Sequence, residues 1–171
     1  TLLAALADRG HRVVPEAGRQ LAREQQAIGG IALPGSELFG HLLLSRSMYL
    51  YEQALSAPHS GPVFFDRSVF EPLAYWRSNG EMPDLVDRAA RRFQYAPIVF
   101  MAPPWPEIFE KDAERRHSFD PGQQEYARLT AIFEAYDYGL VELPKTSVAE
   151  RVGFVERRVE RLLADRAGRG R

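Results

Sequence analysis

The sequence contains no cysteine. That absence excludes disulfide bonds, thiolate metal sites and a cysteine nucleophile, and it fits a reducing compartment. An excess of charge of one sign is also lacking, because 22 basic residues meet 23 acidic ones and the net charge is −1. No global basic field would therefore attract nucleic acid or an anionic membrane. We expect a cytoplasmic protein with neither of them as a partner.

Long hydrophobic runs are missing as well. No run approaches the roughly 18–20 apolar residues of a membrane helix. The apolar opening of residues 1–7 lacks the basic leader and the length of a signal peptide. The motifs HExxH and GxSxG do not occur, so the sequence offers neither a zinc-protease helix nor a nucleophile elbow.

The composition that is present describes an ordinary globular chain. Hydrophobic residues make up 45% and charged residues 26% of the 171 residues. A chain of this length and balance forms one domain with a core of normal size. With no repeat and no linker in the sequence, we expect residues 1–171 to form a single domain.

Short β-rich runs alternate with helical stretches, a pattern that predicts an α/β fold with a parallel sheet covered by helices on both faces. Strands are predicted at residues 11–15, 63–65, 98–101 and 140–143. Helices are predicted at residues 1–9, 17–28, 37–55, 70–77, 83–93, 121–136 and 147–163. Leu85, Ala89 and Phe93 would mark the apolar side of the fifth helix. The charged segment 107–120 is expected to be a mobile lid, and residues 166–171 a frayed tail.

The first predicted helix has no strand ahead of it, although an open parallel sheet needs one there. Unpaired backbone groups are costly when they are buried. We therefore expect the natural protein to carry a hydrophobic strand and a GxxxxGK[ST] phosphate-binding loop just before Thr1.

Asp66 and Arg67 directly follow the apolar run of residues 63–65. Open α/β sheets bind ligands at the carboxyl ends of their strands. There Asp66 could hold Mg²⁺ beside nucleotide phosphates, and Arg67 could bind a phosphate or substrate oxygen bidentately. The alternative is that Asp66 caps the next helix and Arg67 is merely exposed.

Glu16 and Arg19 follow the earlier strand in the same way. Glu16 could orient a substrate hydroxyl or accept its proton, and Arg19 could contact substrate or phosphate. Alternatively, Glu16 is a first-turn glutamate that favours the helix dipole, and Arg19 is a surface arginine.

Two further groups of residues are candidates for the site. Arg115 and Arg116, in the lid-like segment, could neutralise charge on a transferring phosphoryl group, or they could belong to a solvated loop. Tyr49, Tyr75 and neighbouring aromatic residues could line a base-stacking pocket, although at helical spacing they are more often core residues.

Several of these segments carry a family resemblance. They are Thr1-Leu2-Leu3, residues 13–19, 65–68 and 112–116, Ala135-Tyr136, Leu143-Pro144 and residues 148–152. Over nearly its whole length the sequence resembles the AAA-domain family of small P-loop NTPases, which includes the bacterial ribosylnicotinamide kinase domain. More distantly, it is similar to deoxynucleoside and thymidylate kinases.

This resemblance implies a P-loop three-layer sandwich that binds ATP and Mg²⁺. Asp66 would be the metal-side carboxylate, and Arg115 and Arg116 would be lid arginines. Thr1 would lie next to the phosphate-binding loop, and the loop from Pro144 to Val148 would lie near the nucleotide base. The motif GxxxxGK[ST] is absent from this sequence, so its lysine and its metal-binding hydroxyl have no counterpart here.

The leading hypothesis is ATP-dependent transfer of a phosphoryl group to a small metabolite, with nucleosides and nucleotides as the first acceptors to try. One alternative is a regulatory NTPase without an acceptor, and another is a non-enzymatic helical binding module. A kinase needs an enclosed acceptor pocket beside Glu16 and the helix of residues 37–55. A regulatory NTPase would instead show an exposed apolar patch there.

Overall fold

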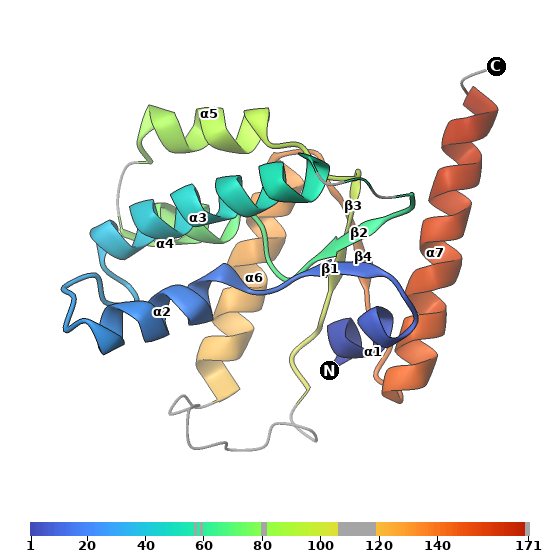
Figure 1. Cartoon of the computed structure of the whole chain (residues 1–171), viewed down its shortest axis with the longest axis horizontal. Coiled ribbons are helices and arrows are strands. Elements are labelled where there is room, and N and C mark those ends of the chain that lie inside the picture. Colours follow the sequence, from blue (N-terminus) through green and yellow to red (C-terminus); the bar gives the residue numbers. More distant parts are fainter. Residues whose placement is uncertain (57, 59, 80–81, 106–118, 170–171) are drawn as a thin grey trace.

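The computed structural model describes residues 1–56, 58, 60–79, 82–105 and 119–169 (Figure 1). The side chains of 75, 78, 79, 119–121 and 169 lie outside this description. The first half of the chain forms α1 (Leu2–Asp8), β1 (Arg12–Val14), α2 (Ala17–Ala27), α3 (Glu37–Ser56) and β2 (Val63–Phe65). The second half forms α4 (Glu71–Asn79), α5 (Asp84–Arg92), β3 (Ile98–Met101), α6 (Phe119–Ala135), β4 (Gly139–Glu142) and α7 (Val148–Arg169). The predicted alternation of strands and helices is confirmed.

The four strands form two parallel pairs. β1 pairs with β2, with Arg12 opposite Val63, and β3 pairs with β4, with Ile98 opposite Gly139. Within the described residues, no ladder joins the two pairs. The parallel direction is as predicted, and the described residues do not by themselves form one continuous sheet.

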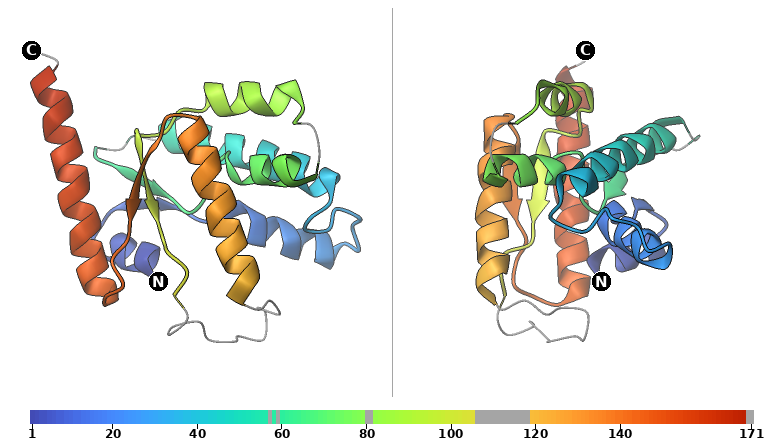
Figure 2. Two further views of the ribbon diagram at one scale, coloured as in Figure 1. Left: turned by 180° about the vertical axis from the view of Figure 1, so that it is seen from behind. Right: turned by 90° about the vertical axis from the view of Figure 1, so that its left-hand side faces the viewer.

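Helices surround the strands on several sides. Figure 1 shows α7 along one side of the strands and α2, α3 and α4 toward the other, and Figure 2 shows α6 alongside β3 and β4. The largest core cluster includes Phe70, Leu73, Val86 and Ile132, all nearly inaccessible to solvent. It joins α4, α5 and α6 and thereby fixes the turn between β2 and α4.

A second core cluster holds α1 against α7. Leu6 packs with Val152 and Val155. At the surface, the Glu156 carboxylate lies 2.6 Å from an Arg9 guanidinium nitrogen and 3.1 Å from Nε2 of His11. The N-terminal helix is therefore anchored by apolar packing and by ion pairs.

Three predicted details are corrected. Leu85 is exposed, because α5 turns Val86, Ala89 and Ala90 inward instead. α6 begins two residues earlier than predicted, which places Pro121 in the first turn, where proline costs no helical hydrogen bond. The expected frayed tail is helical as far as Arg169, because α7 simply continues.

The structure also bears on membrane association. Among the described residues, none of the helices combines the length and the apolar composition that crossing a bilayer requires.

Candidate functional site

The carboxyl ends of β1 and β2 open into a pocket of about 660 Å³. Its walls come from the turns that follow these strands, from α2, α3 and α6, and from residues 34–36. Four of the predicted site residues line it: Glu16, Arg19, Asp66 and Arg67. This is the position, beside Glu16 and α3, at which an acceptor pocket was expected.

Asp66 is held at the end of β2 by its backbone, whose N–H donates to the carbonyl oxygen of Val14 at 2.8 Å. Its carboxylate is partly buried, and burial raises its pKa. The negative charge of Glu16 raises the pKa further, while Arg67 and Arg19 oppose the shift. Asp66 and Glu16 are therefore close enough to repel each other electrostatically.

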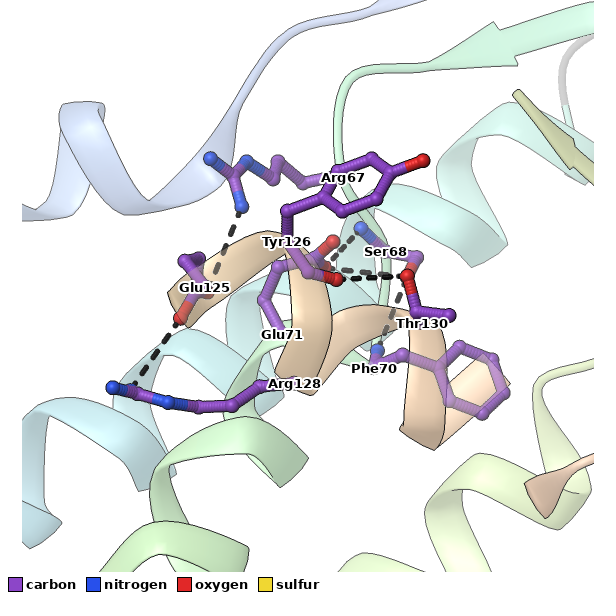
Figure 3. Close-up of polar contacts among 8 residues, drawn as sticks. All are labelled: Arg67, Ser68, Phe70, Glu71, Glu125, Tyr126, Arg128 and Thr130. Carbon is purple, nitrogen blue, oxygen red and sulfur yellow. Dashed lines mark hydrogen bonds and ion pairs between the residues drawn. The ribbon is translucent and has the colours of Figure 1, made fainter. Parts of the chain in front are cut away.

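Asp66 does not cap the helix that follows it. Ser68 Oγ accepts a hydrogen bond from the Phe70 N–H at 3.1 Å, and the Glu71 carboxylate accepts hydrogen bonds from the Ser68 N–H and hydroxyl (Figure 3). Within the described part of the chain, no group donates a hydrogen bond to the Asp66 carboxylate. Asp66 is thus left available to a ligand of the pocket.

Glu16 occupies the N-cap position of α2, but its side chain makes no capping hydrogen bond. Its carboxylate lies 3.6 Å from Nε of Arg19, one turn along the helix. The two side chains therefore form a loose pair at the pocket wall instead of a helix cap.

Arg67 adopts a left-handed backbone conformation, with φ of 73°. That region costs a residue with a Cβ about 1–3 kcal/mol and persists only where the surroundings impose it. Here the hydrogen bonds between Ser68 and Glu71 hold the turn. The Arg67 guanidinium lies 4.0 Å from the carboxylate of Glu125 on α6.

Glu71 is a pocket residue that the sequence analysis missed. Burial raises its pKa to about 7, and the nearby Arg67 charge and the Ser68 hydrogen bonds only partly offset this effect. A signal was present, because Ser68 and Glu71 have the S-x-x-E spacing of a capping box ahead of a helix.

The aromatic candidates turn out differently. Tyr49 is 56% exposed and is not among the residues that line the pocket, and the side chain of Tyr75 lies outside the described residues. Phe39, Phe65 and Tyr95 supply the aromatic lining instead. The hydroxyl of Tyr95 accepts a hydrogen bond from the Val69 N–H at 3.3 Å, which links this ring to the same turn as Arg67.

Comparison with known families adds an independent finding. A family model described as an AAA domain matches residues 1–151. The chain belongs to this AAA-domain family. It is therefore a P-loop NTPase-like α/β domain with a nucleotide-binding function. This confirms the coarser part of the resemblance, while the kinase subfamily stays a prediction. No curated protein and no solved structure matches the chain.

The nucleotide-side candidates of this AAA domain are not among the residues that line the pocket. Thr1 caps α1, its hydroxyl oxygen accepting a hydrogen bond from the Ala4 N–H at 3.2 Å. The loop from Pro144 to Val148 leads into α7, which packs against α1, so the two candidates lie at the same end of the molecule (Figure 1). Their roles toward a nucleotide stay predictions. Arg115 and Arg116 fall outside the described residues. The same holds for the lid predicted at residues 107–120, except for residues 119–120, which belong to the first turn of α6.

The carboxylates of the AAA domain suit a metal ion that is bound jointly by protein and substrate phosphates better than one bound by protein ligands alone. The described residues contain no group of three or more histidine and carboxylate side chains that could enclose an ion. Mg²⁺ typically keeps several waters and binds one or two carboxylates together with substrate phosphates. Asp66, with Glu16 nearby, matches that pattern. Burial and, to a smaller extent, the Glu16 charge raise the pKa of Asp66, and a bound cation would oppose both effects.

Proposed function

We propose that this AAA domain transfers a phosphoryl group from ATP to a small acceptor, with nucleosides and nucleotides as the first candidates. The observation that carries the proposal is the 660 Å³ pocket at the ends of β1 and β2. A domain that only hydrolyses nucleotide has no need of such a pocket. Its lining combines carboxylates, arginines and aromatic rings, which suits a polar acceptor with a flat ring system.

ATP with Mg²⁺, when bound, supplies the phosphoryl group and the cationic charge that stabilises its transfer. In our proposal Asp66 holds the metal side of the site. Glu16 orients the attacking hydroxyl of the acceptor and accepts its proton. Arg19 and Arg67 bind acceptor oxygens, and Phe39, Phe65 and Tyr95 pack against the rest of the acceptor.

A regulatory NTPase is the second candidate, and one observation favours it. Ile28, Ile31 and Leu33 are 63–83% exposed on the segment between α2 and α3, next to pocket residues 34–36. Exposed apolar side chains of this kind often mark a protein-binding surface. The chain has both the pocket and the exposed apolar segment. A measurement must therefore distinguish phosphoryl transfer to an acceptor from regulated nucleotide hydrolysis.

A thermal-shift screen of the full-length protein tests the nucleotide half of the proposal. ATP with Mg²⁺ at 100 times its dissociation constant should stabilise the protein by roughly 2.7 kcal/mol. Compounds that fill the acceptor pocket should add a further shift when ATP is replaced by a non-hydrolysable analogue. No stabilisation by any nucleotide would contradict the proposal and favour a non-enzymatic binding module.

A further inference from the structure

Three arginines line the pocket, and each comes from a different element. Arg19 lies on α2, Arg67 on the turn after β2, and Arg128 on α6. Their side chains are 44–53% exposed, and each is paired with a carboxylate that also lines the pocket. These cations therefore face the space that an acceptor would occupy.

The pocket arginines are held more loosely than other arginines of the chain. Their nitrogen–oxygen distances to Glu16 and Glu125 are 3.6 Å for Arg19, 4.0 Å for Arg67 and 3.7 Å for Arg128. Away from the pocket, the corresponding distances are 2.6 Å for Arg9–Glu156, 2.8 Å for Arg46–Glu24 and 2.8 Å for Arg91–Asp87. Only the second group lies within ordinary hydrogen-bond range.

The guanidinium groups of the pocket arginines donate few hydrogen bonds to the protein. Within the described part of the chain, their guanidinium groups make one hydrogen bond to protein, from Arg128 Nη2 to Gln124 Oε1 at 3.4 Å. The Arg67 backbone is left-handed, and its guanidinium lines the pocket at the turn that Ser68 and Glu71 hold. Arginine donors that line a pocket and are hardly used by protein acceptors are available to an anionic ligand.

Glu125 lies between two of these arginines. One carboxylate oxygen faces Arg67 and the other faces Arg128, so guanidinium groups from two elements converge on a single anion (Figure 3). The carboxylate side chain is 38% exposed, and exposed ion pairs at such distances contribute little to stability. A phosphate monoester brings nearly two negative charges and three acceptor oxygens, so it can take bidentate hydrogen bonds from both arginines at once.

We propose that the acceptor of this pocket carries a phosphate monoester, which is held between Arg67 and Arg128 and displaces Glu125. This inference rests on the proposed function, because it assumes that the pocket is the acceptor site. It divides the pocket into an arginine pair, Arg67 and Arg128, beside Glu125 and a carboxylate pair, Glu16 and Asp66, at the strand ends. A nucleoside would use only the second part, whereas a nucleoside monophosphate would use both.

The test is isothermal titration of the full-length protein, with its nucleotide site saturated by a non-hydrolysable ATP analogue and Mg²⁺. Matched pairs of nucleoside and nucleoside 5′-monophosphate are compared, with inorganic phosphate as a minimal probe. We expect the monophosphate to bind roughly 10- to 100-fold more tightly than the nucleoside, as charge-assisted hydrogen bonds predict. Arg128→Gln should remove most of that preference, and Glu125→Gln should tighten monophosphate binding without changing nucleoside binding.

Two further variants keep the test decisive. Arg158→Gln, on the exposed part of α7, removes an arginine outside the pocket and should leave both affinities unchanged. Arg128→Lys keeps the charge but loses the planar fork, and it should also lose most of the preference, which covers the case that the Gln variant does not fold.

Equal binding of nucleoside and monophosphate to the wild-type protein would overturn the inference, as would a preference that persists in both Arg128 variants. Phosphoryl transfer to phosphate-free acceptors alone would likewise overturn it while leaving the proposed function standing. Conversely, an Arg128-dependent preference without transfer to any acceptor would support the anion site and contradict the kinase function.

Discussion

At the scale of single residues, the pocket depends on side chains that follow directly after two paired strands. Val14 pairs with Phe65, so the residues just beyond them, Glu16 and Asp66, come to lie at one edge of the sheet. The sequence allowed Asp66 to be read either as a helix cap or as a ligand. Because Ser68 and Glu71 make the capping hydrogen bonds, Asp66 is not the helix cap, and its role as a ligand stays a prediction.

Substituting Asp66 tests that reading. Asp66→Asn should leave the fold largely intact, because no hydrogen bond within the described residues depends on this carboxylate. It should lower Mg²⁺-dependent activity by orders of magnitude, because an amide is a neutral and poorer metal ligand. Steady-state kinetics of the variant, with Asp165→Asn on exposed α7 as the matched control, measure the effect. Wild-type turnover in Asp66→Asn would assign the residue to structure alone.

Glu71 predicts a pH dependence of stability. Its pKa in the folded protein is about 7, above the ordinary value of 4.5, so the folded state holds this proton longer than the unfolded state does. The free energy of unfolding should therefore fall as pH rises from about 4.5 to 7, and this group's effect should be constant above that range. The shift corresponds to a loss on the order of 3 kcal/mol.

Chemical denaturation of wild type and Glu71→Gln at pH 5 and pH 8 isolates that effect. Glutamine still offers an oxygen to the Ser68 N–H but carries no buried charge. Its stability advantage over wild type should therefore grow from pH 5 to pH 8. A difference between the two proteins that does not vary with pH would show that Glu71 is not the titrating group.

Some site residues could be predicted from sequence and others could not. Glu16 and Asp66 could, because the end of a β-rich run is visible in the sequence and strand ends are where open sheets bind ligands. Glu125 and Arg128 could not, because they face the pocket only through the packing of α6 against α4. Tyr49 was proposed for the pocket because helical spacing does not reveal which face of α3 is turned inward.

At the scale of elements, hydrophobic periodicity and turn residues predicted every helix and strand of the described chain, and most of their ends to within a few residues. The exception is α7, which continues past the predicted end at Leu163 to Arg169. The lack of a strand ahead of the first helix already indicated a gap in the sheet. Which strands pair with which was not predicted, since hydrogen bonding between distant strands leaves no local pattern. We propose that a hydrophobic strand ahead of Thr1 pairs between β2 and β3 and completes a three-layer sandwich. The proposal rests on the two separate ladders and on the strand order that the family resemblance implies.

Hydrogen exchange tests this strand. In a protein that carries this strand, the backbone amides of Val63–Phe65 and Ile98–Met101 should exchange more slowly than in the chain of residues 1–171 alone, because new ladder hydrogen bonds would protect them. The amides of β1 and β4 serve as the internal comparison, since they would lie on the far sides of the two pairs. Identical exchange at β2 and β3 in both proteins would contradict the inserted strand.

At the scale of the whole molecule, two surface regions suit different kinds of ligand. The pocket at the ends of β1 and β2 suits a small acceptor, whereas Ile28, Ile31 and Leu33 beside it suit a protein partner. Membership of the AAA-domain family fits both, because nucleotide binding serves transfer as well as regulated hydrolysis. The net charge of the chain is close to zero, so neither face attracts a ligand through a long-range electrostatic field. The choice of ligand at each face must therefore depend on the side chains in direct contact with it.

The most direct measurement follows the γ-phosphoryl group of labelled ATP in the full-length protein with Mg²⁺ and a panel of nucleosides and nucleoside monophosphates. We predict that an acceptor from this panel becomes labelled faster than free phosphate appears, and that Asp66→Asn abolishes the labelling. Release of free phosphate at a rate that no acceptor changes, with no labelled acceptor formed, would contradict phosphoryl transfer and identify the domain as a regulatory NTPase.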